Sequence, residues 1–273
     1  MATETYTGNI GEIRAASTAG GGTALTTTLT TIGLLEGTRW ISLTPRNFAT
    51  GVVMKFSFNP YLLIIKTTDA LATSGNLTDF SSAAQDADAA TDVVLSSLDT
   101  AANDDFLYVG SHLQFRGVAV DVDSANGNAS VLTVKYWNGS AWTDSSDVDG
   151  TIDTGKTMAV DGNVTWTVPS DWVADSLLNI GDASTAIGIH VSEPNIYWTR
   201  WEVSLALDSS VTLNSMRALN RVTTYGELLS GQTFEETITM GPGGIGCIEA
   251  LMNAGTGNLV VNVATRSVSG RFI

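Results

Sequence analysis

The stretch SVLTVKYWNGSAWT, residues 130–143, decides the fold class. Polar and apolar residues alternate through LTVKYW, as they do in a β-strand with one buried face. Asn138 and Gly139 follow at once, and an Asn-Gly pair beside an alternating stretch is the strongest short-range signal for a β-hairpin. We therefore predict a tight turn at Asn138 between two strands.

Strand-like stretches recur on both sides of this hairpin. They are rich in β-branched and aromatic residues, and most of them end near residues that form turns. Regularly spaced short strands of this kind predict an all-β fold with a β-sandwich or jelly-roll-like main domain. The stretches are RWISLT (39–44), GVVMKFSF (51–58), YLLIIKTT (61–68), DVVLSSL (92–98), FLYVG (106–110), FRGVAVDV (115–122), NVTWTVP (163–169), AIGIHV (186–191), IYWTRWEVSLAL (196–207), SVTLNSM (210–216) and NLVVNVATRSVSGRFI (258–273).

The chain divides into three parts by composition. Residues 1–38 are small and polar, which buries little surface and favours an extended arm. Residues 76–220 are expected to form the sandwich module. Residues 39–75 together with 221–273 are expected to form a smaller β-rich attachment domain.

Helical patterns are sparse. SDWVADSLLNIG at 170–181 starts with a serine that could cap a helix, and CIEALMNAG at 247–255 ends in a glycine that could close one. Both are expected to be short helices that decorate the sheets. Asn59 and Pro60 are expected to separate the strands on either side of them.

Charge excludes one class of partner. The chain of 273 residues carries 13 basic and 28 acidic residues, a net charge of −15. Such a chain has few cations to exchange for the counterions of a phosphate backbone, so we expect no nucleic-acid partner. The start of the chain lacks the pattern of a secretion signal and no segment is apolar for about 18 residues, so we expect synthesis in the cytoplasm and no membrane span.

Between Lys66 and Arg116 there is no basic residue, whereas eight aspartates lie from Asp69 to Asp105. We expect this stretch to face solvent. A solvated surface is the favoured interpretation, and an acidic docking surface is the alternative.

Nothing in the sequence predicts catalysis or a bound cofactor. The two histidines, His112 and His190, lie in strand-like contexts without a motif for nucleophilic catalysis. Cys247 stands alone among apolar neighbours and is expected to be buried, with no disulfide. GPGGIG at 241–246 is followed by no Lys-Ser/Thr pair, so a turn or bulge is expected there. Aspartates are plentiful enough for a pair of catalytic carboxylates, but their spacing on strands does not predict a cleft.

Two aspartate-rich stretches could offer oxygen ligands to calcium: DVDSANGN at 121–128 and DSSDVDGTID at 144–153. In the first, Gly127 falls one place later than the glycine of the helix-loop-helix calcium motif. In the second, Asp147, Asp149 and Gly150 are too closely spaced. We therefore predict ordinary turns and no metal.

The chain holds seven tryptophans, and six of them lie between residues 137 and 201. They could form the core of the sandwich, or they could be exposed and stack on sugar rings. A regular strand would place Trp198 and Trp201 on opposite faces, and Trp142, just beyond the hairpin turn, is expected to be exposed. The six are Trp137, Trp142, Trp166, Trp172, Trp198 and Trp201.

The stretch from Leu77 to Arg217 resembles a β-sandwich module found repeatedly in structural proteins of tailed phages and prophages. The elements of the module appear here in the same order. They are LTDFSSAAQDADAATDVVLSSLDTAANDDFLYVGS (77–111), FRGVAVDVDSANGNASVLTVKYWNGSAWTD (115–144), DGNVTWTVPSDWV (161–173) and YWTRWEVSLALDSSVTLNSMR (197–217).

This resemblance covers about half of the chain and brings no catalytic residues with it. It implies a virion structural protein without enzymatic activity, assembled on the particle after synthesis in the host cytoplasm. The expected role is a capsid decoration or auxiliary protein, a homo-oligomer that binds the major capsid protein or other virion proteins. The alternative is a tail or fibre adhesin that binds host surface glycans.

Overall fold

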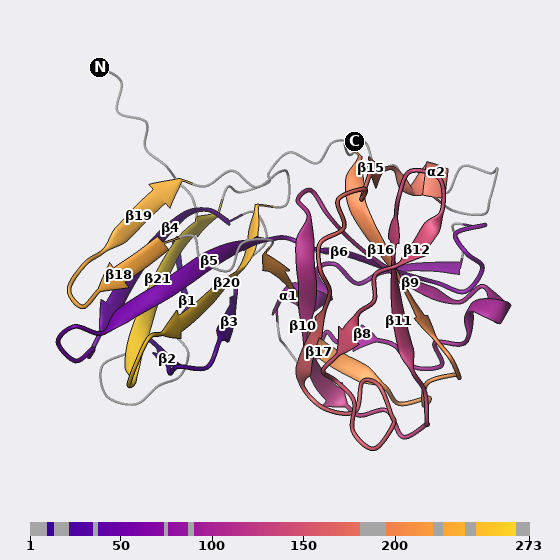
Figure 1. Ribbon diagram of the computed structural model, residues 1–273, viewed down its shortest axis with the longest axis horizontal. Helices are drawn as coiled ribbons and strands as arrows, with labels where there is room; N and C mark the ends of the chain where they lie inside the picture. Colours follow the sequence, from indigo (N-terminus) through magenta and orange to yellow (C-terminus); the bar gives the residue numbers. More distant parts are fainter. Residues whose placement is uncertain are drawn as a thin grey trace. The chain divides into compact units, whose positions relative to one another are not determined.

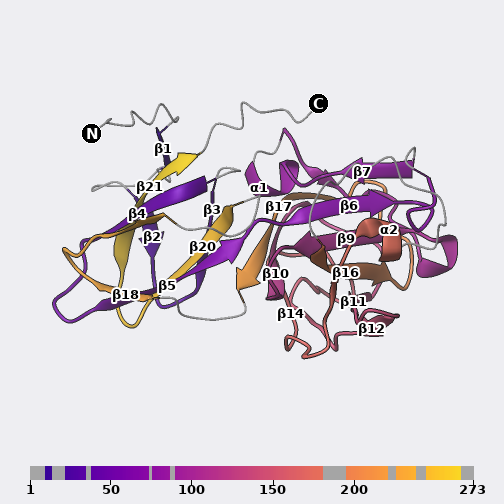
Figure 2. The same ribbon diagram turned by 90° about the horizontal axis from the view of Figure 1, so that it is seen from above.

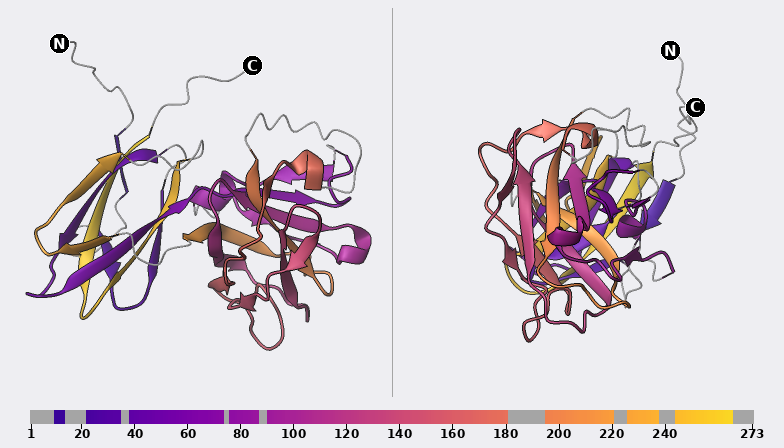
Figure 3. Two further views of the ribbon diagram at one scale, coloured as in Figure 1. Left: turned by 45° about the horizontal axis from the view of Figure 1, so that its top comes forward. Right: turned by 90° about the vertical axis from the view of Figure 1, so that its right-hand side faces the viewer.

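The computed structural model describes residues 10–13, 22–34, 38–73, 76–86, 90–180, 195–220, 226–237 and 244–265 (Figure 1). Strands dominate in every view, and they form four antiparallel sheets (Figure 3). The all-β prediction is therefore confirmed. The chain forms two compact units: Met1–Asn59 with Val222–Ile273, and Pro60–Arg221.

The smaller unit contains two sheets built from both ends of the chain. In the first sheet, the long β21 pairs with β4 along one edge and with β1 and β2 along the other, and β19 lies outside β4. The bounds are β1 (Ile10–Ile13), β2 (Thr23–Leu25), β4 (Thr38–Arg46), β19 (Phe234–Thr237) and β21 (Gly257–Thr265). The second sheet has the order β18 (Gly226–Leu229), β5 (Val53–Pro60), β20 (Ile245–Met252) and β3 (Thr30–Gly33).

These two sheets share one hydrophobic core, to which each contributes alternate residues. Ile41 and Leu43 of β4 come from the first sheet, and Met54, Phe56 and Phe58 of β5 come from the second. Alternation along each strand directs these side chains inward, so the smaller unit is a sandwich held by apolar burial. The strand predicted from residue 258 onward is confirmed by β21 as far as Thr265, where the described residues end, and it pairs with β4.

The N-terminal part differs from a free arm. Within residues 1–38, the described segments contribute β1, β2 and β3, and these pair with β21 and β20. The small, threonine-rich composition that predicted an arm is also compatible with short edge strands, because threonine favours extended backbone. The arm is extended, but its described parts belong to the sheets.

The helix predicted at 247–255 is wrong. CIEALM lies within β20, which is flanked by β5 and β3 and is buried over nearly its whole length. Glu, Ala, Leu and Met favour helix, but a central strand buried on both faces gives a continuous apolar stretch that periodicity cannot distinguish from a helix. Gly255, with φ +68°, lies in the turn between β20 and β21.

The larger unit is a second sandwich, and most of its strands are labelled in Figures 1 and 2. Its first sheet has the order β12 (Trp142–Asp144), β11 (Leu132–Trp137), β16 (Ile196–Val203), β9 (Phe106–Ser111), β6 (Leu63–Thr67) and β7 (Leu77–Asp79), and β15 (Ala174–Asp175) also pairs with β16. We call this the aromatic sheet. The facing sheet has the order β13 (Val148–Asp149), β14 (Gly162–Thr165), β10 (Phe115–Ser124), β17 (Thr212–Asn220) and β8 (Val93–Val94).

The boundaries of the units differ from those expected. The chain leaves the smaller unit at residue 60 and returns at 222, whereas we expected the first boundary at residue 75. The reason is β6, which pairs with β9 and so belongs to the larger unit. Asn59 and Pro60 were expected to separate two strands, but they form the end of β5, and the break before β6 falls at residues 61–62.

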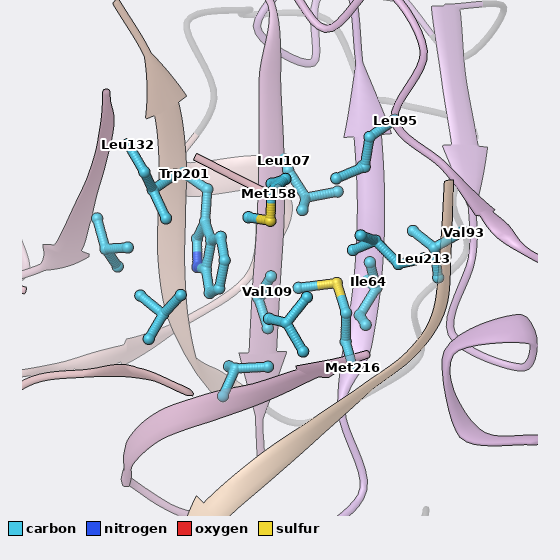
Figure 4. Close-up of a cluster of buried hydrophobic side chains, with 14 of the residues drawn as sticks. Ile64, Val93, Leu95, Leu107, Val109, Leu132, Met158, Trp201, Leu213 and Met216 are labelled. Carbon is cyan, nitrogen blue, oxygen red and sulfur yellow. The ribbon is translucent and has the colours of Figure 1, made fainter. Parts of the chain in front are cut away.

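The core of the larger unit lies between its two sheets (Figure 4). Trp201 of β16 is fully buried there, against aliphatic and methionine side chains from both sheets. Those labelled with it in Figure 4 are Ile64, Val93, Leu95, Leu107, Val109, Leu132, Met158, Leu213 and Met216. This core explains why the alternating stretches of the sequence fold as strands.

The tight turn predicted at Asn138 is confirmed. Trp137 pairs with Trp142 across the hairpin, and the Asn138 carboxamide oxygen accepts hydrogen bonds from the backbone N–H groups of Ser140 and Ala141. Gly139 has φ +94°, a conformation that glycine adopts without a steric penalty. The loop thus spans four residues and is stabilised by the asparagine side chain.

Helices are shorter than predicted. The stretch 170–181 was expected to form a helix of about two turns, but residues 174 and 175 form β15 and the helix α2 covers only Leu177–Ile180. The indole N–H groups of Trp137 and Trp198 bind Asp175 and hold this segment against the aromatic sheet. Tertiary contacts therefore override the local helical pattern. The other short helices are α1 (Ala83–Asp86) and the 3-10 turn Ala101–Asn103.

Asn126 ties together three loops at one end of the larger unit. Its side-chain amide donates to the carbonyls of Asn128 and Thr157 at 2.9 and 3.0 Å, and its oxygen accepts from the N–H groups of Asn128 and Asp208 at 3.0 Å each. Its own backbone N–H donates to Met158 O at 2.9 Å. The side chain is buried, so each of these bonds satisfies a group that water does not freely reach.

Substitution of Asn126 by alanine should lower the free energy of unfolding by about 2 kcal/mol, because it leaves several backbone groups without partners. The matched control is Asn128→Ala, which removes one exposed bond to Ala206 O and should cost less than about 0.5 kcal/mol. Urea denaturation followed by circular dichroism measures both. Equal losses for the two variants would contradict the role assigned to Asn126.

Candidate functional site

The aromatic sheet carries four of the six tryptophans that the sequence offered for ligand binding, which are Trp137, Trp142, Trp198 and Trp201. Trp166, Trp172 and Trp201 are buried in the core between the sheets, and Trp198 is buried on the opposite face of the aromatic sheet. The prediction that Trp198 and Trp201 lie on opposite faces is confirmed. Both are nevertheless buried, because each face of this sheet is covered.

The outer face of the aromatic sheet carries a second, smaller core. Ile65, Phe106 and Tyr108 pack there with Trp198. Residues from the loop after β6 and from α2 cover them, and these are Ala70, Leu71, Leu177 and Ile180. The sheet is therefore sandwiched between two apolar layers, which a strict alternation of polar and apolar residues does not predict.

Each of the six tryptophans satisfies its indole N–H within the chain. Trp142 donates to Ile180 O at 3.3 Å, although it was expected to be exposed; it is half-buried and packs on Tyr108 and Trp137. The remaining acceptors are Asp175 Oδ2 for Trp137, Phe115 O for Trp166, Trp198 O for Trp172, Asp175 O for Trp198 and Thr199 Oγ1 for Trp201. The rings thus serve as structural elements that join strands and loops.

Charged residues complete this outer face. The guanidinium of Arg200 lies 4.3 Å from the centre of the Phe106 ring and 5.0 Å from that of Trp142. Glu202 accepts from Arg200 Nε at 2.8 Å and pairs with Lys135 Nζ at 2.8 Å. The cation is held between aromatic faces and neutralised by the carboxylate, an arrangement that stabilises the sheet.

The sequence analysis missed Arg200, Glu202 and Lys135. Period-two spacing in YWTRWEV places Trp198, Arg200 and Glu202 on one face of β16, so the pattern was available in the sequence. Only strand register brings Lys135 opposite Arg200. The half-exposed rings of Trp137 and Trp142 are the part of this cluster that a sugar ring could reach, and the polar groups beside them are already engaged with one another.

The two aspartate-rich stretches form a strand end and turns. Asp121 and Asp123 lie in β10 and accept hydrogen bonds from Asn214 and Thr212. In the second stretch, the Asp149 carboxylate accepts from both the N–H and the hydroxyl of Thr151, at 2.8 and 2.6 Å. The carboxylates thus act as local acceptors for turns, as aspartate commonly does.

Asp147 is a half-buried carboxyl of this region. Burial raises the pKa of Asp147, and the neighbouring charges of Asp144 and Asp149 raise it further, while the hydrogen bond from Val134 N–H acts in the opposite direction. That bond is 2.8 Å long and joins the loop to β11. Within the described ranges, no three His, Cys, Asp or Glu side chains lie close enough together to hold a metal ion.

The acidic stretch between Lys66 and Arg116 does not face solvent throughout. Asp105 is only 5% exposed and accepts from the N–H of Asp99 at 2.9 Å. Burial raises the pKa of Asp105, and the nearby ammonium of Lys66 partly offsets this effect. The prediction of solvent exposure is thus wrong for Asp105.

The other candidate residues belong to different segments of the chain. His112 is half-buried in the turn between β9 and β10, and His190 lies outside the described residues. Cys247 is buried in β20, as predicted. Of the glycine-rich stretch 241–246, the described part begins at Gly244, which has φ +75° and directly precedes β20.

None of the helices in the described part of the chain is long and apolar enough to cross a membrane. The sequence has no match among family models, curated proteins or solved structures.

Proposed function

We propose that this chain is a virion structural protein of a tailed bacteriophage, and that it decorates the capsid without catalysing a reaction. The observation that carries the proposal is the coincidence of a sequence resemblance with a structural unit. The stretch Leu77–Arg217, which resembles a module of phage structural proteins, falls within the compact unit Pro60–Arg221. A module that recurs in different proteins is expected to fold as one unit.

The path of the chain supports different roles for the two units. The larger unit is inserted into the smaller one, since the chain leaves the smaller unit at residue 60 and re-enters it at residue 222. The smaller unit can then attach to the shell while the inserted sandwich is displayed. Major capsid protein or another virion protein is the proposed partner, and the functional form is a homo-oligomer on the virion.

The tryptophans favour decoration over adhesion to glycans. An adhesin that stacks sugars needs exposed rings beside free polar groups. Here four of the six tryptophans are buried, and the two half-buried ones donate their N–H groups within the chain. A net charge of −15 would also keep coated particles dispersed.

Cosedimentation of the full chain with capsids that lack it tests this proposal. We expect saturable binding at a fixed number of copies per capsid, and no additional binding to capsids that already carry the protein. The full chain is required because deletion of residues 1–38 would remove β1, β2 and β3 from the smaller unit. No binding to capsids, together with binding to host glycans that is lost in Trp142→Ala, would replace decoration by the adhesin alternative.

A further inference from the structure

The larger unit has one end that is remote from the connections to the rest of the chain. The chain enters at Pro60 and leaves at Arg221, and register places Leu63 opposite Gly110 and Asn220 opposite Phe115. At the other end of the strands, Ser124 pairs with Thr212. Three loops gather at this second end, which we call the loop end: residues 124–131, 145–161 and 204–211.

Exposed aliphatic side chains concentrate at the loop end. In the described part of the chain nine large hydrophobic side chains are exposed, and five of them lie at or beside this end. Val131 and Leu205 are each 58% exposed. The other three are Val94, Ile152 and Val160. Scattered exposed aliphatics are ordinary, but a concentration at one end of a unit marks an interaction surface.

Hydrogen bonds bring these residues together. Val131 exchanges two bonds with Ser204, both 2.9 Å, so Val131 and Leu205 are neighbours. The N–H of Val160 donates to Thr151 O at 3.2 Å, which places Val160 beside Ile152.

Hydrogen bonds also link the pair Val131 and Leu205 to the pair Ile152 and Val160. Thr157 N donates to Ser130 O at 3.1 Å, and the hydroxyls of Thr157 and Thr151 are 3.4 Å apart. The aliphatic residues therefore occupy one continuous group of loops.

These loops are held in place before any partner arrives. The four side-chain bonds of Asn126 connect the loops 124–131, 145–161 and 204–211. Ser130 adds a bond from its hydroxyl to Leu205 O at 2.8 Å. A surface that is already ordered loses little conformational entropy on binding, which favours affinity.

The charge around these aliphatic residues is strongly negative. Asp123, Asp153 and Asp161 are exposed and Asp208 is half-exposed, whereas Lys156 is the one basic residue in the three described loops. Opposite charge on a partner would steer association and suppress wrong partners.

We propose that the loop end docks a protein surface that presents aliphatic side chains rimmed by lysine or arginine. This partner is distinct from the shell contact proposed above for the smaller unit, and the proposal does not depend on decoration. A second copy of the chain would bring its own carboxylates against these, and like charges repel. Phosphate backbones and anionic bilayers are excluded in the same way.

The probe is an amphipathic peptide of leucine and lysine, titrated into the full chain. Fluorescence anisotropy gives the Kd, and two-dimensional amide NMR spectra locate the peptide. We expect shifts confined to the loop end, and at least roughly tenfold weaker binding of a lysine-only peptide, since burial of a few aliphatic groups is worth that much.

A matched pair of variants tests the site. Val131→Ser with Leu205→Ser should raise the Kd roughly tenfold or more. Leu113→Ser with Val173→Ser alters two side chains that are each 42% exposed at the opposite end, and should leave the Kd unchanged. Equal Kd values for the two double variants, or NMR shifts spread over all acidic surfaces, would overturn the proposal in favour of unspecific charge attraction.

Discussion

Trp201→Ala should lower the free energy of unfolding of the larger unit by about 3 to 5 kcal/mol, the range for loss of a large aromatic side chain from a core. Trp201 is 0% exposed and lies among the side chains that join the two sheets (Figure 4). The substitution also removes the donor that binds Thr199 Oγ1 at 3.0 Å. Since β16 is central in its sheet, the neighbouring strands cannot close the cavity without losing their register.

Urea denaturation followed by near-ultraviolet circular dichroism measures this effect. Two units can unfold in separate transitions, and only the transition of the larger unit should move. Trp137→Ala is the control, because Trp137 is half-buried on the outer face and should cost about 1 to 2 kcal/mol. A loss for Trp201→Ala no greater than that of the control would show that the sandwich core is not where we place it.

Gly110→Ala is expected to be nearly as damaging, with a loss of about 3 kcal/mol, although it adds a single methyl group. Gly110 pairs with Trp198 across β9 and β16, and the indole lies over it. A Cβ at this position would lie 2.4 Å from Trp198 Cε3 and 2.6 Å from Cζ3. The ring cannot move away easily, because its N–H is bound to Asp175 O at 3.1 Å.

A double-mutant cycle isolates this clash. In a Trp198→Leu background the added methyl meets no ring, so Gly110→Ala should cost at least about 1.5 kcal/mol less than in the wild type. Gly127→Ala is the control within the same unit, since the nearest atom is the flexible carboxylate end of Asp208. If Gly110→Ala cost the same in both backgrounds, steric contact with Trp198 would not be its cause.

The sequence predicts the sheets well because alternation is a local property. Each strand of the sandwiches that has one buried face, such as β11, shows apolar residues at every second position. Prediction fails where both faces are buried. The CIEALM stretch of β20 then looks like a helix, and the opposite faces expected for Trp198 and Trp201 do not reveal that both rings are buried.

Long-range pairing is the second limit of sequence reasoning. The boundary at residue 60 follows from the pairing of β6 with β9. The cluster of Arg200, Glu202 and Lys135 depends on the register of β11 with β16. The loop end could not be predicted from the sequence either, because its aliphatic residues are separated by up to about 110 positions in the chain. Hydrogen bonds of Asn126 and Ser130 bring these residues together, and no local sequence motif predicts those bonds.

The insertion of one unit into the other has a consequence for synthesis on the ribosome. Arg46 of β4 pairs with Asn258 of β21, so more than 200 residues must be translated after β4 before it can pair with β21. At an elongation rate of roughly 5 to 20 residues per second this takes roughly 10 to 40 s, and residue 221, where the inserted unit ends, is translated roughly 2 to 7 s before residue 258, which is long enough for a small β-domain to fold. The inserted sandwich is therefore complete while the smaller unit is still open. During this interval the unpaired strands of the smaller unit are exposed to neighbouring nascent chains. Strand exchange between adjacent copies of the protein would be easiest at that stage.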